Sequence, residues 1–342
     1  MQQFFSVISK LVYLGTNPTR PTKEFNSWRL PESLKIMKIT STRIATSADA
    51  KAIAELANEH ELSVDSKSSL FSEQGALDFI AGYIDSSPAY LISLDGESGF
   101  SAVVNLHPDS VRGRYFTDVY SRPYVESLES IVLWAIELAE SEHPDWDMWP
   151  GVNSLDKRLQ SAWTKHGFEF LRRYYTMRMK ISSAPSIRLI QDVEIRAIDI
   201  ENPDQVALWH SAHQNSFSSH FGFAPRELDK WRELVLEPAT DPNGVFLAFK
   251  NGEPVGFCQC NDEYAEENKG FINLLGVTHE NQGMGIGEAL LQTGISYCLT
   301  KGYNSVELNV DTGNETGALK LYEKVGFRPE SSWIQMHRPR PL

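Results

Sequence analysis

Cysteine is scarce in this chain of 342 residues, which contains three cysteines without a repeated spacing. Cys258 and Cys260 fall in a predicted strand, where residues two apart point to the same face. They lack the C-x-x-C spacing and the second ligand pair of a zinc site. We therefore expect no disulfide framework, no metal, and a reduced cytoplasmic protein.

Long apolar runs and an excess of positive charge are also missing. No run approaches the roughly 18 uninterrupted apolar residues of a membrane-spanning helix, so no membrane association is expected. Asp and Glu number 45 against 32 Lys and Arg, and the formal net charge is -13. Because a nucleic-acid partner requires a basic surface, none is expected.

The length and composition favour a globular protein with more than one domain. The chain is long enough for two domains, and its 41% hydrophobic and 11% aromatic content supports packed cores. Residues 1–36 contain three prolines and show no clear period, and residues 1–10 lack the basic start of a signal peptide. We expect 1–36 to be a poorly ordered extension.

A glycine-rich turn stands between a predicted strand and a predicted helix in the second half of the chain. The strand is the apolar run Phe271–Val277, and helical apolar spacing begins at Ile286. Between them, Gln282–Gly287 reads Q-G-M-G-I-G. Glycines let a backbone approach a ligand closely, and helix N-terminal N–H groups bind phosphate oxygens. The turn lacks the Lys-Ser/Thr of a P-loop, and its G-x-G-x-G spacing differs from the dinucleotide G-x-G-x-x-G.

This segment resembles one signature of the GNAT acyl-CoA N-acyltransferase superfamily, Q/R-x-x-G-x-G/A. Residues Val310–Phe327 resemble the other signature, which is a strand end, a loop with Asn, a helix carrying Leu-Tyr, and then Gly-Phe. The order and distance of the two segments also fit. His213–Phe223 and Leu274–Val277 are similar to the corresponding segments of tandem, mycothiol synthase-like GNAT proteins. The resemblance implies that the glycine turn binds the pyrophosphate of coenzyme A.

The resemblance also implies the residues of a donor site. In the family, a backbone N–H near Leu275 holds the acyl carbonyl, the N–H of Val277 binds the pantetheine arm, and Tyr322 protonates the departing thiolate. We expect a bulge at Gly276. Asn314 either caps the following helix or binds the pantetheine arm. The cofactor-binding residues expected are Leu275, Val277, Gln282, Gly283, Met284, Gly285, Ile286, Gly287 and Asn314.

The general base is left open by the sequence. Some family members carry a Glu on the strand before the glycine turn, but Asn273 is the polar residue here. Glu307 on the next predicted strand is the candidate base, acting directly or through water. It is equally compatible with a solvent-facing strand residue, and an ordered water chain is a third possibility.

The chain repeats itself once. At an offset of 159 residues, Trp163 corresponds to Tyr322 and Thr117 to Gly276. Where the second copy has Gly283–Gly287, the first has Tyr124–Leu128, whose side chains would block a phosphate cradle. Trp cannot replace Tyr as a proton donor. We therefore expect one donor site per chain, in the second copy.

Together these features predict an α/β protein of two tandem GNAT-like domains, each a mixed, mostly antiparallel sheet flanked by helices. A degenerate domain spans 37–181, a linker 182–188, and the catalytic domain 189–342. The predicted reaction moves the acetyl group of acetyl-CoA to a primary amine of a small molecule or peptide. Two alternatives are a non-catalytic acyl-CoA-binding module and an aminoacyl-transferase that uses charged tRNA. The oligomeric state is left open.

Overall fold

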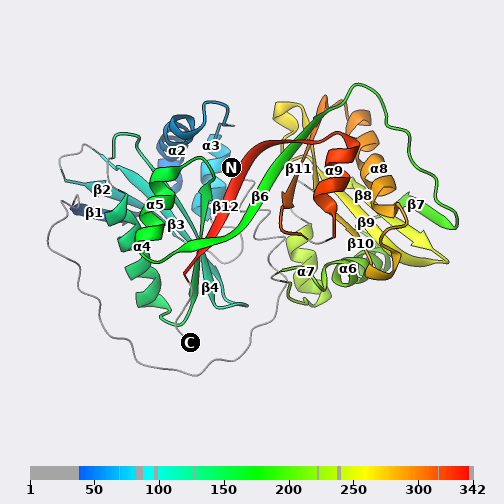
Figure 1. The fold of residues 1–342 in the computed structure, drawn as a ribbon, viewed down its shortest axis with the longest axis horizontal. Coiled ribbons are helices and arrows are strands. Elements are labelled where there is room, and N and C mark those ends of the chain that lie inside the picture. The colour runs from blue at the N-terminus through cyan, green and yellow to red at the C-terminus, as the bar shows by residue number, and fades with distance from the viewer. Residues whose placement is uncertain are drawn as a thin grey trace. The chain divides into compact units, whose positions relative to one another are not determined.

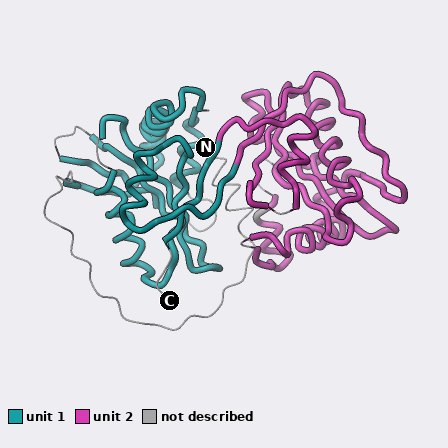
Figure 2. Tube along the Cα trace, in the orientation of Figure 1, with its two compact units in different colours: residues 1–6, 17–174, 332–342 teal, residues 7–16, 175–331 magenta. Residues whose placement is uncertain are grey.

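The computed structural model describes residues 38–68, 70–81, 88–95, 99–125, 128–221, 223–236, 240–314 and 316–338 (Figure 1). The predicted extension 1–36 lies outside the described residues. The chain forms two compact units (Figure 2). The described part of unit 1 runs from 38 to 174 and from 332 to 338, and that of unit 2 from 175 to 331.

Unit 1 is a mixed sheet with helices on both faces. Its elements are β1 (Ile39–Ile44), η1 (Ser47–Asp49), α2 (Ala50–Val64), α3 (Glu73–Ala81), β2 (Ala89–Leu94), β3 (Ala102–Asp109), β4 (Arg114–Ser121), α4 (Glu129–Glu142), β5 (Asp147–Asn153) and α5 (Lys157–Lys165). Its strands lie in the order β1-β2-β3-β4-β5-β12. The β4–β5 pair is parallel and the other described pairs are antiparallel, as the sequence predicted.

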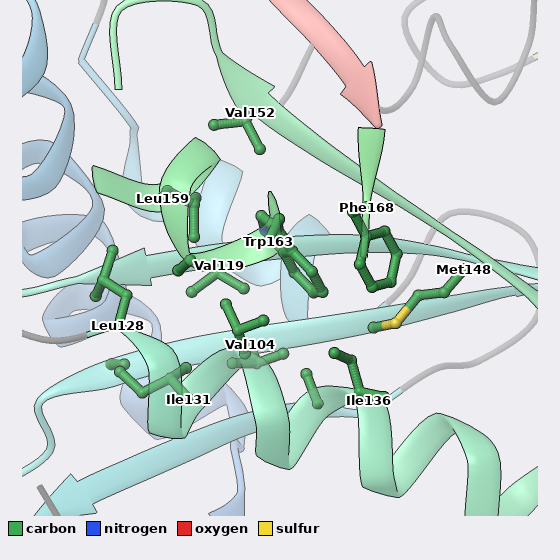
Figure 3. Packing of buried hydrophobic residues seen from close by; sticks show 14 of the residues in the cluster. Val104, Val119, Leu128, Ile131, Ile136, Met148, Val152, Leu159, Trp163 and Phe168 are labelled. Atoms are coloured by element: carbon green, nitrogen blue, oxygen red, sulfur yellow. The ribbon is translucent and has the colours of Figure 1, made fainter. Parts of the chain in front are cut away.

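The core of unit 1 has two parts because β4 alternates its side chains between the faces of the sheet. Val119 faces α4 and α5, where it packs in one buried cluster with Trp163 and Phe168 (Figure 3). Tyr120 faces α2 and α3 and belongs to a second cluster with Phe79. Helices α2 and α3 therefore cover one face of the sheet, and α4 and α5 cover the other.

Unit 2 repeats this layout. Its elements are β7 (Val193–Ala197), α6 (Pro203–Phe217), α7 (Leu228–Val235), β8 (Thr240–Lys250), β9 (Glu253–Asn261), η2 (Ala265–Glu267), β10 (Lys269–Val277), η3 (His279–Asn281), α8 (Ile286–Thr300), β11 (Ser305–Asp311) and α9 (Ala318–Val325). The strand order is β6-β11-β10-β9-β8-β7, with β10–β11 parallel and the β7–β8, β8–β9 and β9–β10 pairs antiparallel. The predicted strand Phe271–Val277 is present within β10, and the predicted helix begins at Ile286 as α8.

Local signals account for several of these elements. Asn251 and Gly252 have φ values of 54° and 86°, which are the left-handed conformations of a two-residue hairpin turn between β8 and β9. Helix α6 begins with Asn202 as its N-cap, whose side chain accepts hydrogen bonds from the backbone N–H groups of Asp204 and Gln205, and with Pro203 at its first position. Within the described residues, no helix combines the length and apolar character that a bilayer span requires.

The last strand of each sequence copy pairs outside its own copy. Strand β12 (Arg328–His337) pairs antiparallel with β5, with Trp333 opposite Asn153. At the end of β6 (Glu169–Lys180), Thr176 donates a hydrogen bond to Asn309 of β11 at 2.8 Å. The chain passes between the units within β6 and within β12 (Figure 2). The domain boundaries predicted from the repeat remain predictions.

The two faces of the unit 2 sheet carry different helices. Helices α8 and α9 pack on one face, in a buried cluster that includes Leu290 and Tyr322. Helices α6 and α7 pack on the other face, in a cluster that includes Trp209, Trp231 and Phe257. The candidate site lies where β10, between these layers, separates from β11.

Candidate active site

Strands β10 and β11 diverge halfway along β10. Their parallel pairing covers Lys269–Ile272, although β10 continues to Val277 and β11 to Asp311. On its other side, β10 stays paired with β9 as far as Val277. Strand β10 therefore separates from β11 beyond Ile272. We call the opening between the two strand ends the wedge.

The predicted bulge at Gly276 was wrong. The register shift between β10 and β9 lies between Ile272 and Leu274, and Gly276 pairs regularly with Phe257. A glycine is required at position 276 for a different reason, which is close packing. A Cβ there would lie 2.6 Å from a ring carbon of Phe257 and 3.0 Å from Cβ of Ser216 on α6. The glycine thus allows α6 and Phe257 to approach the strand end closely.

The backbone alternation of β10 determines which amides face the wedge. The N–H of Thr278 donates to the carbonyl of Val255 at 2.9 Å, so that pair is a hydrogen-bonded one. In an antiparallel ladder, hydrogen-bonded and non-hydrogen-bonded pairs alternate. Leu275 and Val277 fall in non-hydrogen-bonded pairs with β9, and their N–H groups point away from β9 into the wedge. The carbonyl of Val277 accepts a hydrogen bond from Gln282 Nε2 at 3.1 Å.

The glycine turn has the open backbone expected of a phosphate cradle. Gly283 and Gly285 have φ values of 75° and 88°, a conformation that side chains rarely adopt. Gly285 is the N-cap of α8, so the first N–H groups of the helix have no intrahelical partner. A Cβ on Gly283 would meet nothing within 4 Å.

The side chains of the turn point in different directions. Ile286 is 1% exposed, so its side chain belongs to the core and its backbone alone can contact a ligand. Met284 is 40% exposed. A Cβ on Gly287 would make ordinary 3.5 Å contacts with Val277 and Leu321. The end of β10, the glycine turn and α9 therefore meet at Gly287.

Tyr322 lies on α9, one residue after Leu321. It is 7% exposed, and its ring packs edge-on against Phe327 at 6.2 Å. Burial, with a smaller contribution from the Cys258 thiol, raises its pKa above the usual range. Cys258 pairs across the ladder with Leu275. Tyr322 therefore stays protonated at neutral pH, and it belongs to the buried cluster against which Leu275 packs. No described residue hydrogen-bonds its hydroxyl.

Asn314 does not cap α9. Its Oδ1 accepts a hydrogen bond from the backbone N–H of Thr316 at 2.9 Å, and α9 begins at Ala318 with Gly317 as its N-cap. The capping alternative was wrong because the left-handed Gly317, at φ 76°, separates the Asn314 turn from the helix. Contact of Asn314 with the pantetheine arm remains a prediction.

Glu307 is held by two cations. It is 1% exposed, and its Oε1 lies 2.5 Å from Arg178 Nε and 3.2 Å from Lys269 Nζ. The solvent-facing alternative is excluded by this burial. The ion pairs favour a structural role, because they tie the carboxylate to Arg178 and Lys269 within the sheet. A general-base role for Glu307 remains untested.

The loop after α6 contacts the segment before the glycine turn. Ser219 Oγ lies 2.9 Å from Nε2 of His279 in η3. His213, one turn before the end of α6, is 2% exposed and stacks on Phe217 at 4.8 Å. Burial lowers the pKa of His213 to about 3, so it is neutral at physiological pH. Sequence reasoning missed the Ser219–His279 contact because no local pattern joins positions 60 residues apart.

Unit 1 has a wedge of its own but not the same groups. Strand β4 pairs with β5 at Arg114–Thr117 and then continues unpaired on that side. In the predicted counterpart of the glycine turn, residues 126 and 127 lie outside the described residues, while Val125 and Leu128 are buried in the core. Trp163, the counterpart of Tyr322, is fully buried against Phe168. It offers no acid for a leaving group.

Polar groups instead surround the unit 1 wedge. Asp118 on β4 and Glu61 on α2 are each 2% exposed, and burial raises the pKa of both carboxyl groups. Glu61 accepts a hydrogen bond from Asn153 at 3.0 Å, and His60 Nε2 lies 3.1 Å from Asp156. Across the described chain, no group of three or more His, Cys, Asp or Glu side chains is arranged to hold a metal.

Comparisons with known proteins agree with this geometry. Residues 206–327 match the model of the Acetyltransferase (GNAT) family. The chain is 26% identical over 297 residues to the mycothiol acetyltransferase of Streptomyces griseus subsp. griseus, covering 82% of this chain and 89% of that protein. It is 26% identical over 305 residues to the mycothiol acetyltransferase of Sanguibacter keddieii, covering 86% and 94%.

Solved structures share the fold. A GCN5-related N-acetyltransferase from Sphaerobacter thermophilus has a TM-score of 0.73 at 22% identity, covering 88% of this chain and 96% of that chain. A tandem GNAT protein from the clavulanic acid biosynthesis pathway has a TM-score of 0.64 at 12% identity, covering 88% and 99%.

The fold and the comparisons define an acyltransferase with two tandem GNAT domains. Residues 206–327 match the GNAT acetyltransferase family, and the chain is similar to mycothiol acetyltransferases over most of its length. The predicted family, fold class and enzyme class are confirmed.

Proposed function

We propose that unit 2 binds acetyl-CoA and transfers its acetyl group to a primary amine of a small molecule. The observation that carries the proposal is the end of β10. There the amides of Leu275 and Val277 face the wedge, the side chains of both residues pack on the buried cluster that contains Tyr322, and the glycine turn follows. Unit 1 offers no comparable combination among its described residues.

The residues present fit the donor along its length. The amide of Val277 would hold the pantetheine arm, and the turn Gly283–Gly287 would hold the pyrophosphate. The fit rests on the left-handed glycines and on the uncovered N–H groups at the start of α8. The thioester, when bound, supplies an activated acyl group with a thiolate leaving group.

The chain supplies two interactions with the reacting atoms in this proposal. The N–H of Leu275 donates a hydrogen bond to the acyl oxygen and stabilises the negative charge that develops there. Tyr322 donates its proton to the sulfur as the C–S bond breaks. No side chain is assigned as the base, because Glu307 is occupied by its two cations. The amine proton therefore leaves to water.

A small-molecule acceptor is supported by the relatives. Relatives that match over most of this chain are named mycothiol acetyltransferases, a name that indicates a small-molecule acceptor. The intact glycine turn and the net charge of -13 weigh against an aminoacyl-tRNA donor.

The proposal is tested with a matched pair of glycine substitutions on α8. Gly285→Glu places a charged side chain at the start of the helix, in the proposed phosphate cradle. Gly302→Glu places the same side chain just after the end of the helix, at a φ of 89° against 88° for Gly285. The backbone strain is therefore matched, and a Cβ on Gly302 would meet nothing within 4 Å.

Calorimetry with acetyl-CoA should show binding by the wild type and by Gly302→Glu, and loss of binding by Gly285→Glu. Binding of the Gly285→Glu variant within a few-fold of wild type would refute the cradle assignment. Thiol release across a panel of primary amines then tests turnover. Donor binding without turnover on any amine would favour a non-catalytic binding module.

A further inference from the structure

Arg188 lies against the glycine turn although it belongs to neither signature. It precedes the segment 206–327 that matches the family model. Its backbone N–H donates to Oε1 of Gln292 on α8 at 2.8 Å, which holds this part of the chain on the helix. A Cβ on Gly285 would lie 2.9 Å from both Cζ and Nη1 of Arg188. The guanidinium therefore lies directly on the N-cap of α8.

This position is unfavourable for a cation in isolation. The N-terminus of a helix carries a partial positive charge from its unpaired N–H groups. The nearby carboxylate is that of Glu288, 3.8 Å from Arg188 Nη1. Glu288 is more tightly engaged by Lys324, whose Nζ lies 2.7 Å from the same oxygen. One shared carboxylate thus faces two side-chain cations and the positive end of a helix.

A third cation lies at the turn. Nζ of Lys250, at the end of β8, is 3.7 Å from Sδ of Met284. The turn therefore gathers positive charge on a chain whose net charge is -13. Such local charge is stabilised by a bound anion, and an anion with several charges would suit it best.

We infer that Arg188 binds a phosphate group of the donor at the glycine turn and is a determinant of affinity for phosphorylated donors. The inference rests on the proposed function, because it takes a coenzyme A-type donor as the ligand. Arg is suited to this role since its planar guanidinium can donate two hydrogen bonds to one phosphate. Glu288 holds the guanidinium at the turn when no phosphate is present.

The test compares Arg188→Gln with Arg196→Gln in the full chain. The two arginines are similarly exposed, at 56% and 49% of their side chains. Arg196 is a suitable control because its guanidinium packs on the ring of Phe249, 4.3 Å from the centroid, and not on the turn. Calorimetry measures the Kd of coenzyme A, of 3′-dephospho-coenzyme A and of pantetheine.

For Arg188→Gln we expect the Kd of coenzyme A to rise about tenfold, as for the loss of a charge-assisted hydrogen bond. The Kd of pantetheine should stay within about twofold, and Arg196→Gln should match wild type for each ligand. A penalty that persists with 3′-dephospho-coenzyme A assigns Arg188 to the pyrophosphate, and one that disappears assigns it to the 3′-phosphate.

Two results would overturn the inference while leaving the proposed function intact. In the first, the wild type binds coenzyme A and Arg188→Gln changes the Kd by less than twofold. The other is an equal loss for pantetheine, which has no coenzyme A phosphates. Failure of the wild type itself to bind coenzyme A would instead refute the proposed function, so the two failures are distinguishable.

Discussion

Replacing Tyr322 with Phe removes the hydroxyl oxygen of a buried side chain and leaves the ring in place. The ring packs on Phe327, and no described residue hydrogen-bonds the hydroxyl. Because no buried partner loses its hydrogen bond, the free energy of unfolding should change by less than about 1 kcal/mol. The effect should therefore appear in catalysis.

The expected loss is in kcat and not in the KM for acetyl-CoA, because the proton is transferred as the C–S bond breaks. General-acid catalysis contributes about 10²–10⁴-fold, which corresponds to roughly 2.7–5.5 kcal/mol of barrier. The raised pKa of Tyr322 means that it remains a proton donor through neutral pH. The wild-type rate should therefore show no decline from this group below about pH 10.

The assay is thiol release at saturating amine, with a single-turnover measurement to show that chemistry limits the rate. Thermal unfolding of both proteins controls for stability. A loss in kcat of less than about threefold, with chemistry limiting, would refute the proton-donor role and leave Tyr322 as a packing residue.

Three further outcomes follow from the described contacts. Glu307→Gln removes one carboxylate from Arg178 and Lys269, which keep Glu330 and Glu267 as partners, and should lower the free energy of unfolding by about 1–3 kcal/mol in urea titration, with kcat nearly unchanged; a large loss of kcat at unchanged stability would instead identify a base. Asp118 has a raised folded-state pKa, so its stabilisation is complete below its unfolded pKa of about 3.9 and is lost as pH rises toward the folded value. Asp118→Asn should therefore gain stability over wild type between about pH 4 and 7, and a pH-independent difference would contradict this. Calorimetry should give one acetyl-CoA per chain, since the first copy has Tyr124–Leu128 where the second has the glycine turn Gly283–Gly287; a stoichiometry of two would contradict a single donor site.

Much of the fold could be predicted because its signals are local. The turn at Asn251-Gly252 requires left-handed backbone at two successive residues, and that sequence adopts it readily. The glycines of the cofactor turn act through the same conformational freedom, so their positions marked the start of α8. Trp163 and Tyr322 could be matched in the sequence because each is followed by a Phe five positions later. In the structure each ring packs against that Phe.

The remaining features depend on residues far apart in the chain. The register shift lies between Ile272 and Leu274, where pairing with β11 ends while pairing with β9 continues, and this depends on both partner strands. From the sequence, Glu307 was a candidate base. In the folded chain it is ion-paired with Arg178, which is 129 positions away. Arg188 gave no signal, since its proposed role depends on contacts with Gln292 and Glu288 and on its position at Gly285, all about 100 residues away in the chain.

The sequence by itself therefore determined the class of fold, the repeat, and the position of the glycine turn and of Tyr322. Tertiary structure decided that β12 pairs with β5, which amides face the wedge, and which charged groups are already paired. The physical reason is that turn and helix signals act over a few residues. Strand partners and buried ion pairs depend on which surfaces meet when the whole chain has packed.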